Sequence, residues 1–164
     1  MNGLRCTRHW TPLTDGECSL AIGSLTLDPV APSIVYAGTG EANLSVDSYY
    51  GCGVLRSTDG AATWTRLGAP LLANLSISRI LVDQATAGSP TTPTVFAATN
   101  LNNATSNCQG LLKSANSGAT WTGVLGGCVS DLEQDPSNPS TLYAGVQFNG
   151  VYKAIKYASN RVQP

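Results

Sequence analysis

The sequence predicts an all-β protein, a partial β-propeller of about three four-stranded antiparallel blades, two complete and flanked by incomplete ones. Trp-Thr pairs recur at Trp10, Trp64 and Trp121, at intervals of 54 and 57 residues. Apolar residues alternate with polar ones, which is typical of strands with a buried face. Turn-forming residues separate these runs, so that each repeat of about 50 residues holds four short strands, as a propeller blade does.

The second half of each repeat is the more regular one. GVLRSTDGAATWT begins at Gly53, and GLLKSANSGATWT begins at Gly110. Both read as glycine, two apolar residues, a basic residue, serine, a turn and then Ala-Thr-Trp-Thr. A third copy begins as GVYKA at Gly150 and then loses the pattern. Each full copy predicts a strand, a tight turn and a second strand.

A second block precedes each of these segments and predicts two further strands joined by a polar turn. It reads SLTLDPVAPSIVYAGTGE from Ser24, RILVDQATAGSPTTPTVFAATN from Arg79 and DLEQDPSNPSTLYAGVQ from Asp131. For the first full repeat we expect strands near Gly23–Leu27, Ile34–Gly38, Gly53–Ser57 and Thr63–Leu67.

The repeats divide the chain into blades. We expect the tail of a preceding blade in residues 1–12, one blade in 13–68, a second in 69–125 and a partial blade in 126–164. Closed propellers have about 4–8 blades. We therefore expect a fragment of a larger ring, or a protomer that gains its missing blades by self-association, because an end blade leaves one apolar face without a neighbour.

Composition excludes several classes of partner. Charged residues make up 12% of the chain, the net charge is −1 and the basic residues are scattered, so nucleic-acid binding is not expected. No apolar run approaches the roughly 20 residues that cross a bilayer, so membrane insertion is not expected. The first ten residues, MNGLRCTRHW, lack the apolar stretch of a signal peptide. No cofactor is predicted.

Five cysteines allow two disulfides. Cys108 and Cys128 bracket one hairpin-like stretch, and Cys18 and Cys52 could tie two neighbouring connections on one face. The fifth cysteine would then be free or paired with a residue outside this chain. The alternative is that all five are buried thiols; disulfides are favoured because loop cysteines are less often core filler. No CxxC spacing and a single histidine, His9, predict no metal site.

The two Trp-containing segments resemble the Asp-box (BNR) repeat, SxDxGxTW, of sialidases, xyloglucanase-type hydrolases and sortilin-like receptors. Ala61 and Asn116 stand where that repeat has glycine and aspartate. The resemblance extends to flanking text such as YAGTGEAN, which is similar to bacterial secreted BNR-repeat proteins, and it implies an extracellular or cell-surface propeller. The matching residues are Ser57, Asp59, Thr63 and Trp64 in the first copy, and Ser114, Gly118, Thr120 and Trp121 in the second.

The residue types of this box suit a structural turn. An Asp or Asn side chain accepts hydrogen bonds from N–H groups just downstream, and a Ser hydroxyl adds another. A small residue permits unusual backbone angles, and Trp packs between blades. Asn116 should preserve the turn, whereas Ala61 is unfavourable if its position needs a positive φ. The alternative role, a catalytic carboxylate at Asp59, is disfavoured because Asn116 cannot do acid–base chemistry. The resemblance also implies that the boxes lie on the face opposite an active site.

The longest loop, GEANLSVDSYYGC from Gly40 to Cys52, is the candidate ligand site. Its acids and aromatic rings suit carbohydrate, because rings stack on sugar faces and acids bind hydroxyls. The alternative, and the commoner role of a long loop, is a solvated segment whose tyrosines cover a neighbouring blade. The corresponding loop from Thr99 lacks acids, which weakens the case for paired carboxylates. The candidate residues are Glu41, Asn43, Asp47, Tyr49 and Tyr50.

No catalytic residue is predicted. Sialidase chemistry needs an arginine cluster and a tyrosine nucleophile with an acidic partner, and most glycosidases need two facing carboxylates; the sequence indicates neither. The favoured function is a non-catalytic segment of an extracellular propeller that acts as scaffold or binds carbohydrate or protein. The alternatives are a fragment of a sialidase- or xyloglucanase-like glycoside hydrolase and a sortilin-like peptide-binding propeller.

Overall fold

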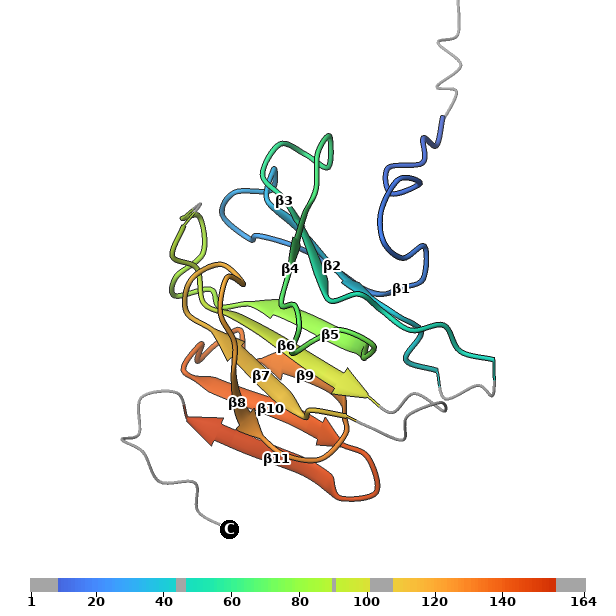
Figure 1. Cartoon of the computed structure of the whole chain (residues 1–164). Helices are drawn as coiled ribbons and strands as arrows, with labels where there is room; N and C mark the ends of the chain where they lie inside the picture. Colours follow the sequence, from blue (N-terminus) through green and yellow to red (C-terminus); the bar gives the residue numbers. More distant parts are fainter. Residues whose placement is uncertain (1–8, 44–46, 90, 101–107, 156–164) are drawn as a thin grey trace, which may run out of the picture.

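The computed structural model describes residues 9–43, 47–89, 91–100 and 108–155, which form three antiparallel sheets and no helix (Figure 1). The strands are β1 (Ile22–Leu27), β2 (Val35–Thr39), β3 (Val54–Ser57), β4 (Thr65–Leu67), β5 (Ser76–Val82), β6 (Val95–Asn100), β7 (Leu111–Ser114), β8 (Thr122–Leu125), β9 (Val129–Gln134), β10 (Thr141–Val146) and β11 (Gly150–Ile155).

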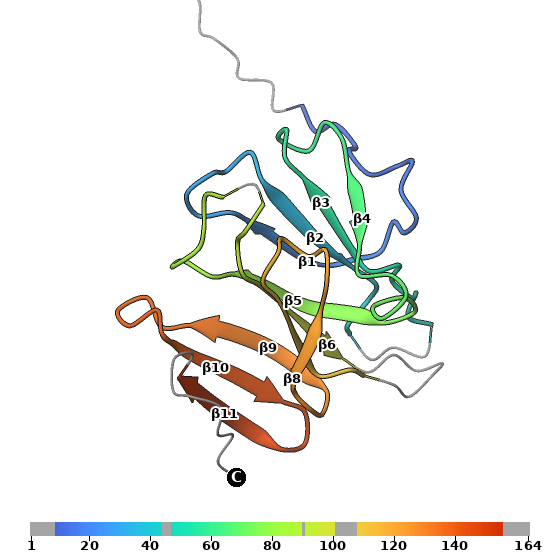
Figure 2. The same ribbon diagram turned by 60° about the vertical axis from the view of Figure 1, so that its left-hand side comes forward.

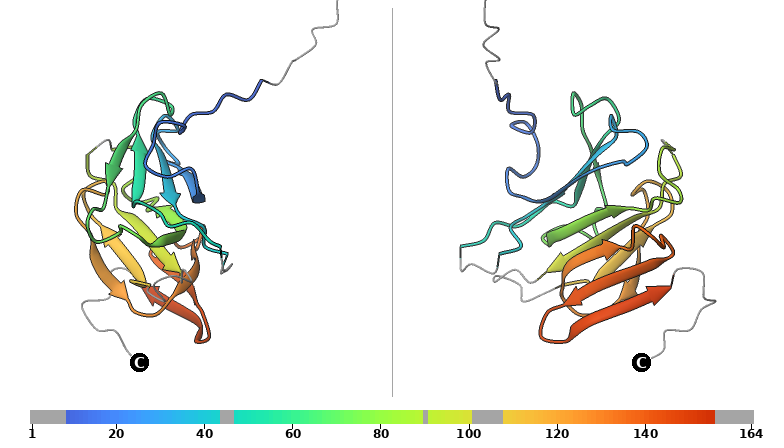
Figure 3. Two further views of the ribbon diagram at one scale, coloured as in Figure 1. Left: turned by 45° about the vertical axis from the view of Figure 1, so that its right-hand side comes forward. Right: turned by 180° about the vertical axis from the view of Figure 1, so that it is seen from behind.

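Each sheet is one repeat of the sequence. We call β1-β2-β3-β4 blade one, β5-β6-β7-β8 blade two and β9-β10-β11 blade three, in the order in which the strands pair. The sheets stack face to face along the chain, and the first strands β1, β5 and β9 follow one another along one side of the stack (Figures 2 and 3). The predicted fold class, a partial propeller of about three blades, is confirmed.

The core lies between the blades. Successive residues of a strand point to opposite faces of its sheet, so Ile80 of β5 packs toward blade one and Leu81 packs toward blade three. Tyr36 fills the first of these interfaces and Phe96 the second, and both are buried. The alternating sequence of blade two therefore serves two interfaces at once, because blade two is covered by a neighbouring blade on both faces.

Side-chain hydrogen bonds also join the first strands of adjacent blades. The hydroxyl of Thr26 donates to the Ile80 carbonyl at 2.7 Å, and the Ile80 N–H donates to Ser24 Oγ at 2.8 Å. One blade further on, Ser78 Oγ donates to the Val129 carbonyl at 2.6 Å. The first strands β1, β5 and β9, which we call the inner strands, are thus hydrogen-bonded directly from one blade to the next.

Two disulfides fix the connections outside the sheets. Cys18 is bonded to Cys52, with a Cα–Cα distance of 6.1 Å, and Cys108 is bonded to Cys128, at 5.2 Å. The first holds residues 9–21, which form no strand, against the start of β3. The second joins the segment before β7 to the connection between blades two and three.

Candidate functional site

The first strand of every blade has an irregularity at the same position. The register of the pairing shifts between Ile22 and Ser24 in β1 and between Ile77 and Arg79 in β5. In β9 the register shifts between the residues that pair with Gly145 and Val146 of β10. Such β-bulges insert an extra residue and turn it away from the ladder. The inserted residues are Gly23, Ser78 and Ser130, and all three come to the wall of one pocket.

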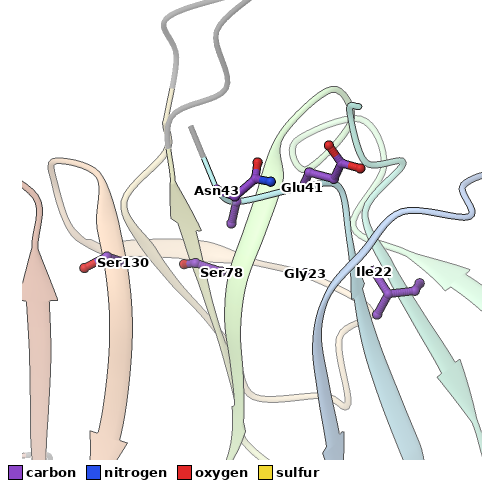
Figure 4. Close-up of a pocket in the computed structure, with 7 residues that line it drawn as sticks. Ile22, Gly23, Glu41, Asn43, Ser78 and Ser130 are labelled. Carbon is purple, nitrogen blue, oxygen red and sulfur yellow. The ribbon is translucent and has the colours of Figure 1, made fainter. Parts of the chain in front are cut away.

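This pocket lies where the inner strands of the three blades meet the loop between β2 and β3 (Figure 4). Its volume is about 380 Å³, which is within the range of small-ligand sites. The described residues that line it are Ile22, Gly23, Glu41, Ala42, Asn43, Ser78 and Ser130.

The loop residues in the pocket are held by the loop itself. The Glu41 N–H donates to the Tyr49 carbonyl at 2.9 Å, and the Tyr49 N–H donates to Glu41 Oε2 at 3.2 Å. Ser48 Oγ donates to Asn43 Oδ1 at 2.8 Å. Asn100 of blade two donates to the Ala42 carbonyl at 3.3 Å, so the neighbouring blade also supports the loop.

The structure divides the five candidate ligand residues into two groups. Glu41 and Asn43 line the pocket, whereas Asp47, Tyr49 and Tyr50 do not. Tyr49 is largely exposed and Tyr50 is partly exposed, so neither ring is committed to the core. The loop therefore brings one carboxylate and one carboxamide to the pocket and leaves two aromatic rings outside it.

Sequence reasoning missed Gly23, Ser78 and Ser130. A signal for them exists, because each stands five residues before the aspartate that follows its strand, Asp28, Asp83 or Asp135. The type of residue differs for a steric reason: a Cβ at Gly23 would lie 2.4 Å from the Ile77 carbonyl oxygen. Blade one therefore requires glycine at the position where the other blades have serine.

The chemistry available in the pocket is that of polar recognition. Ser78 Oγ also lies 3.2 Å from the Ala98 carbonyl, and Ser130 Oγ donates to the Gly145 carbonyl. Because these bonds use the hydroxyl hydrogens, each serine oxygen keeps acceptor capacity for a ligand. Among the described lining residues Glu41 is the single carboxylate, and hydrolysis of a glycosidic bond ordinarily takes two. In the part of the chain that the structure describes, no three metal-ligating side chains come together.

The turn between β3 and β4 lies at the opposite end of blade one. Ser57 Oγ donates to Asp59 Oδ1 at 2.7 Å and accepts from the Ala61 N–H at 2.9 Å. Asp59 in turn accepts from the Thr63 N–H and hydroxyl, at 2.9 and 2.7 Å. These bonds, those from Thr63 foremost, lower the pKa of Asp59 from 3.8 to about 2.

The turn between β7 and β8 has the same architecture around an amide. Ser114 Oγ donates to Asn116 Oδ1 at 2.9 Å and accepts from the Gly118 N–H at 2.8 Å. Asn116 Oδ1 accepts from the Thr120 N–H at 2.9 Å, while its Nδ2 group donates to the Thr120 hydroxyl at 3.0 Å. The amide therefore keeps the turn by reversing the direction of one hydrogen bond.

Both turns need two residues with positive φ. Gly60 and Ala61 have φ of 70° and 69°, and Ser117 and Gly118 have φ of 60° and 93°. Each turn thus places one glycine and one strained residue in the left-handed region. Ala61 does occupy an unfavourable conformation, which the Ser57 bond to its N–H stabilises.

The tryptophans of the two turns have different neighbours. Trp121 Nε1 donates to the Gly118 carbonyl at 2.8 Å, and its ring packs on the core between blades one and two. Trp64 Nε1 donates to the Leu13 carbonyl at 2.9 Å. The N-terminal segment is therefore the neighbour of Trp64.

The described residues contain no helix with the length and hydrophobicity that a bilayer crossing requires. No protein-family model matches the chain, and no curated protein matches it either. Similarity is found among solved structures.

An ancestral GH74 enzyme superposes with a TM-score of 0.59 at 20% identity, over 82% of this chain and 17% of that one. The GH74 xyloglucanase of Xanthomonas campestris gives 0.50 at 17% identity, over 73% of this chain and 17% of that one. YCF48 from Cyanidioschyzon merolae gives 0.52 at 13% identity, over 85% of this chain and 35% of that one. This chain thus spans about a third or less of each. At such identities the likeness concerns the fold, which is that of a β-propeller.

Proposed function

We propose that this chain is a non-catalytic segment of an extracellular Asp-box repeat propeller that binds carbohydrate in the pocket beside the inner strands. The Ser-Asp-Thr and Ser-Asn-Thr bond networks support the assignment to the Asp-box class, because two turns in equivalent places use the same donors and acceptors. The paired disulfides support an oxidising, extracellular location.

The pocket geometry is the observation that carries the binding proposal. Three blades contribute small residues at equivalent bulges, and the loop adds Glu41 and Asn43 above them. A carboxylate, a carboxamide and two hydroxyls can bind sugar hydroxyls as donors and acceptors together. Tyr49, exposed on the same loop, offers a ring face against which a longer saccharide could stack.

A glycan array followed by calorimetry on the best hit tests this function. The Glu41→Gln substitution should weaken binding about tenfold or more, because an ionised acceptor forms stronger hydrogen bonds than a neutral one. The glutamine side chain can still accept the Tyr49 N–H bond, so the loop should keep its conformation.

Asp47→Asn is the matched control, since it removes the same charge from the same loop at a residue that does not line the pocket. It should bind as the wild type does. Equal losses in both variants would place the ligand on the loop surface instead of in the pocket. An array on which the folded protein binds no glycan would refute the carbohydrate proposal.

Similarity to two GH74 enzymes favours one alternative, that the chain is a segment of a glycoside hydrolase. In that case a partner carboxylate for Glu41 would come from outside the described residues. Release of reducing ends from xyloglucan by the purified chain, lost in Glu41→Gln, would establish this alternative in place of a binding role.

A further inference from the structure

Blade three and the N-terminal segment each contain only part of the four-strand repeat among the described residues. Blades one and two each have four strands, whereas blade three has three among the described residues. Residues 10–13, Trp-Thr-Pro-Leu, repeat the fourth-strand sequences Trp-Thr-Arg-Leu from Trp64 and Trp-Thr-Gly-Val from Trp121. They are described in the structure without any strand partner. One segment thus has a fourth-strand sequence and no sheet, and one sheet lacks a fourth strand.

The N-terminal segment already sits where the fourth strand of a preceding blade would lie. Between blades one and two, Leu67 of β4 lies beside the turn of the next blade: a Cβ on Gly118 would be 2.9 Å from Leu67 Cδ1 and 3.3 Å from Trp121 Cζ2. Leu13, the counterpart of Leu67, is bonded through its carbonyl to Trp64, the counterpart of Trp121. The Cys18–Cys52 disulfide fixes the segment that follows it to blade one.

The face of blade one that would meet a preceding blade is open at its inner strand. Leu25 of β1 corresponds in register to Ile80 of β5 and Leu132 of β9. Ile80 and Leu132 are each 1% exposed against the blade before them, but Leu25 is 65% exposed. An apolar residue that is buried in both equivalent interfaces therefore has no cover in this one.

The opposite face, on blade three, is open in the same way. Val151 of β11 corresponds to Val54 of β3 and Leu111 of β7, which are 0% and 5% exposed because a following blade covers them. Val151 is 77% exposed. Beside it, β11 pairs with β10 and has an unpaired edge among the described strands, which is the kind of edge that accepts another strand.

We propose that these two surfaces bind each other between two copies of this chain, so that residues 10–13 of one copy complete blade three of the other. The register follows from the repeats: Thr65 pairs with Arg56 and Thr122 pairs with Lys113, so Thr11 pairs with Lys153 of the second copy. Pro12 is then on the outermost strand, where proline is tolerated.

Two copies close a ring. Each copy contributes blades one and two, the three strands of its own blade three, and the fourth strand of the other copy's blade three. This amounts to three blades per copy and six blades per ring. That number is within the range of known propellers. The pocket beside the inner strands then faces the inner strands of the second copy, so the ligand site is completed by the partner. The proposed contact between the two copies does not itself depend on any ligand.

Light scattering on the purified full chain tests the assembly, and the expected mass is twice that of the chain. Val151→Asp and Leu25→Asp should each give a monomer with an unchanged far-UV spectrum, because both side chains are exposed in the single copy. Val124→Asp, an exposed valine on β8 away from both faces, is the matched control and should remain a dimer. A monomeric wild type at all concentrations, or dissociation by Val124→Asp equal to that by Val151→Asp, overturns the proposal.

Disulfide trapping tests the register, in a background where Cys6 is serine. Thr11→Cys protein mixed with Lys153→Cys protein should form a covalent dimer on mild oxidation. Ala154→Cys places the thiol on the other face of β11 and should cross-link at least tenfold more slowly. Equal rates for the two positions, or chains longer than two copies, would contradict the paired, closed ring.

Discussion

Removal of the Cys18–Cys52 disulfide should cost more stability than removal of Cys108–Cys128. The two bonds span 34 and 20 residues. A cross-link lowers the entropy of the unfolded chain by an amount that grows with the logarithm of the loop length, which gives about 3.8 kcal/mol for the longer loop and about 3.3 kcal/mol for the shorter at 25 °C. Domains are typically stable by about 5–15 kcal/mol, so either loss is large.

The assay is urea unfolding of two double variants, Cys18→Ala with Cys52→Ala and Cys108→Ala with Cys128→Ala. With an m-value of about 2 kcal/mol/M, a loss of 3.8 kcal/mol lowers the midpoint by about 2 M. Alanine avoids a buried hydroxyl at Cys52, which is buried in the native state. Protein concentration is held constant across variants, because association also contributes to apparent stability.

A specific result would refute this reasoning. If the first double variant lost less than about 1 kcal/mol while the second lost about 3, loop closure would not be the function of the Cys18–Cys52 bond. Residues 9–21 would then be held to blade one by packing and by the Leu13–Trp64 hydrogen bond. A change in tryptophan fluorescence at urea concentrations below the main transition, absent from a Trp64→Phe variant, would show that the segment beside Trp64 detaches first.

Two further predictions concern the turns. The Asp59 carboxylate has a folded pKa of about 2 against 3.8 unfolded, so its contribution to stability is complete above pH 3.8 and is lost as the pH falls toward 2. The difference in urea midpoint between wild type and Asp59→Asn should therefore shrink between pH 3.8 and pH 2. A constant difference would contradict the assignment of the lowered pKa to Asp59. Gly118→Ala should destabilise the protein by about 1–2 kcal/mol in urea unfolding, from its positive φ and the contact with Leu67. Ala61→Gly should be neutral or stabilising, by less than about 1 kcal/mol; the reverse order of these two variants would be inconsistent with the φ argument.

The repeat made most of the fold predictable. The first three strands of blade one lie within about one residue of their expected ranges. The fourth begins at Thr65 instead of Thr63, because the Thr63 N–H and hydroxyl are bonded to Asp59 and so belong to the turn. Local sequence could not show this, since Thr and Trp are good strand residues whether or not a turn uses them.

The pocket was less predictable than the blades. The pattern of a long loop with acids and amides predicts Glu41 and Asn43 as ligand residues, and both line the pocket, but their binding of a ligand stays a prediction. Asp47, Tyr49 and Tyr50 belong to the same pattern and do not line the pocket. Ser78 and Ser130 reach it through bulges, which depend on how paired strands register and not on residue type. Comparison of equivalent positions across the three repeats is the approach that could have identified them.

The hydrogen bonds from Thr26 to Ile80 and from Ser78 to Val129 have a consequence for internal motion. Hydrogen bonds fix both distance and angle, whereas apolar packing farther from the inner strands is non-directional. Rocking of one blade against the next therefore has its smallest amplitude at the inner strands and grows toward the rim. A small molecule bound beside the inner strands would therefore contact a rigid surface even while the outer edges of the blades fluctuate.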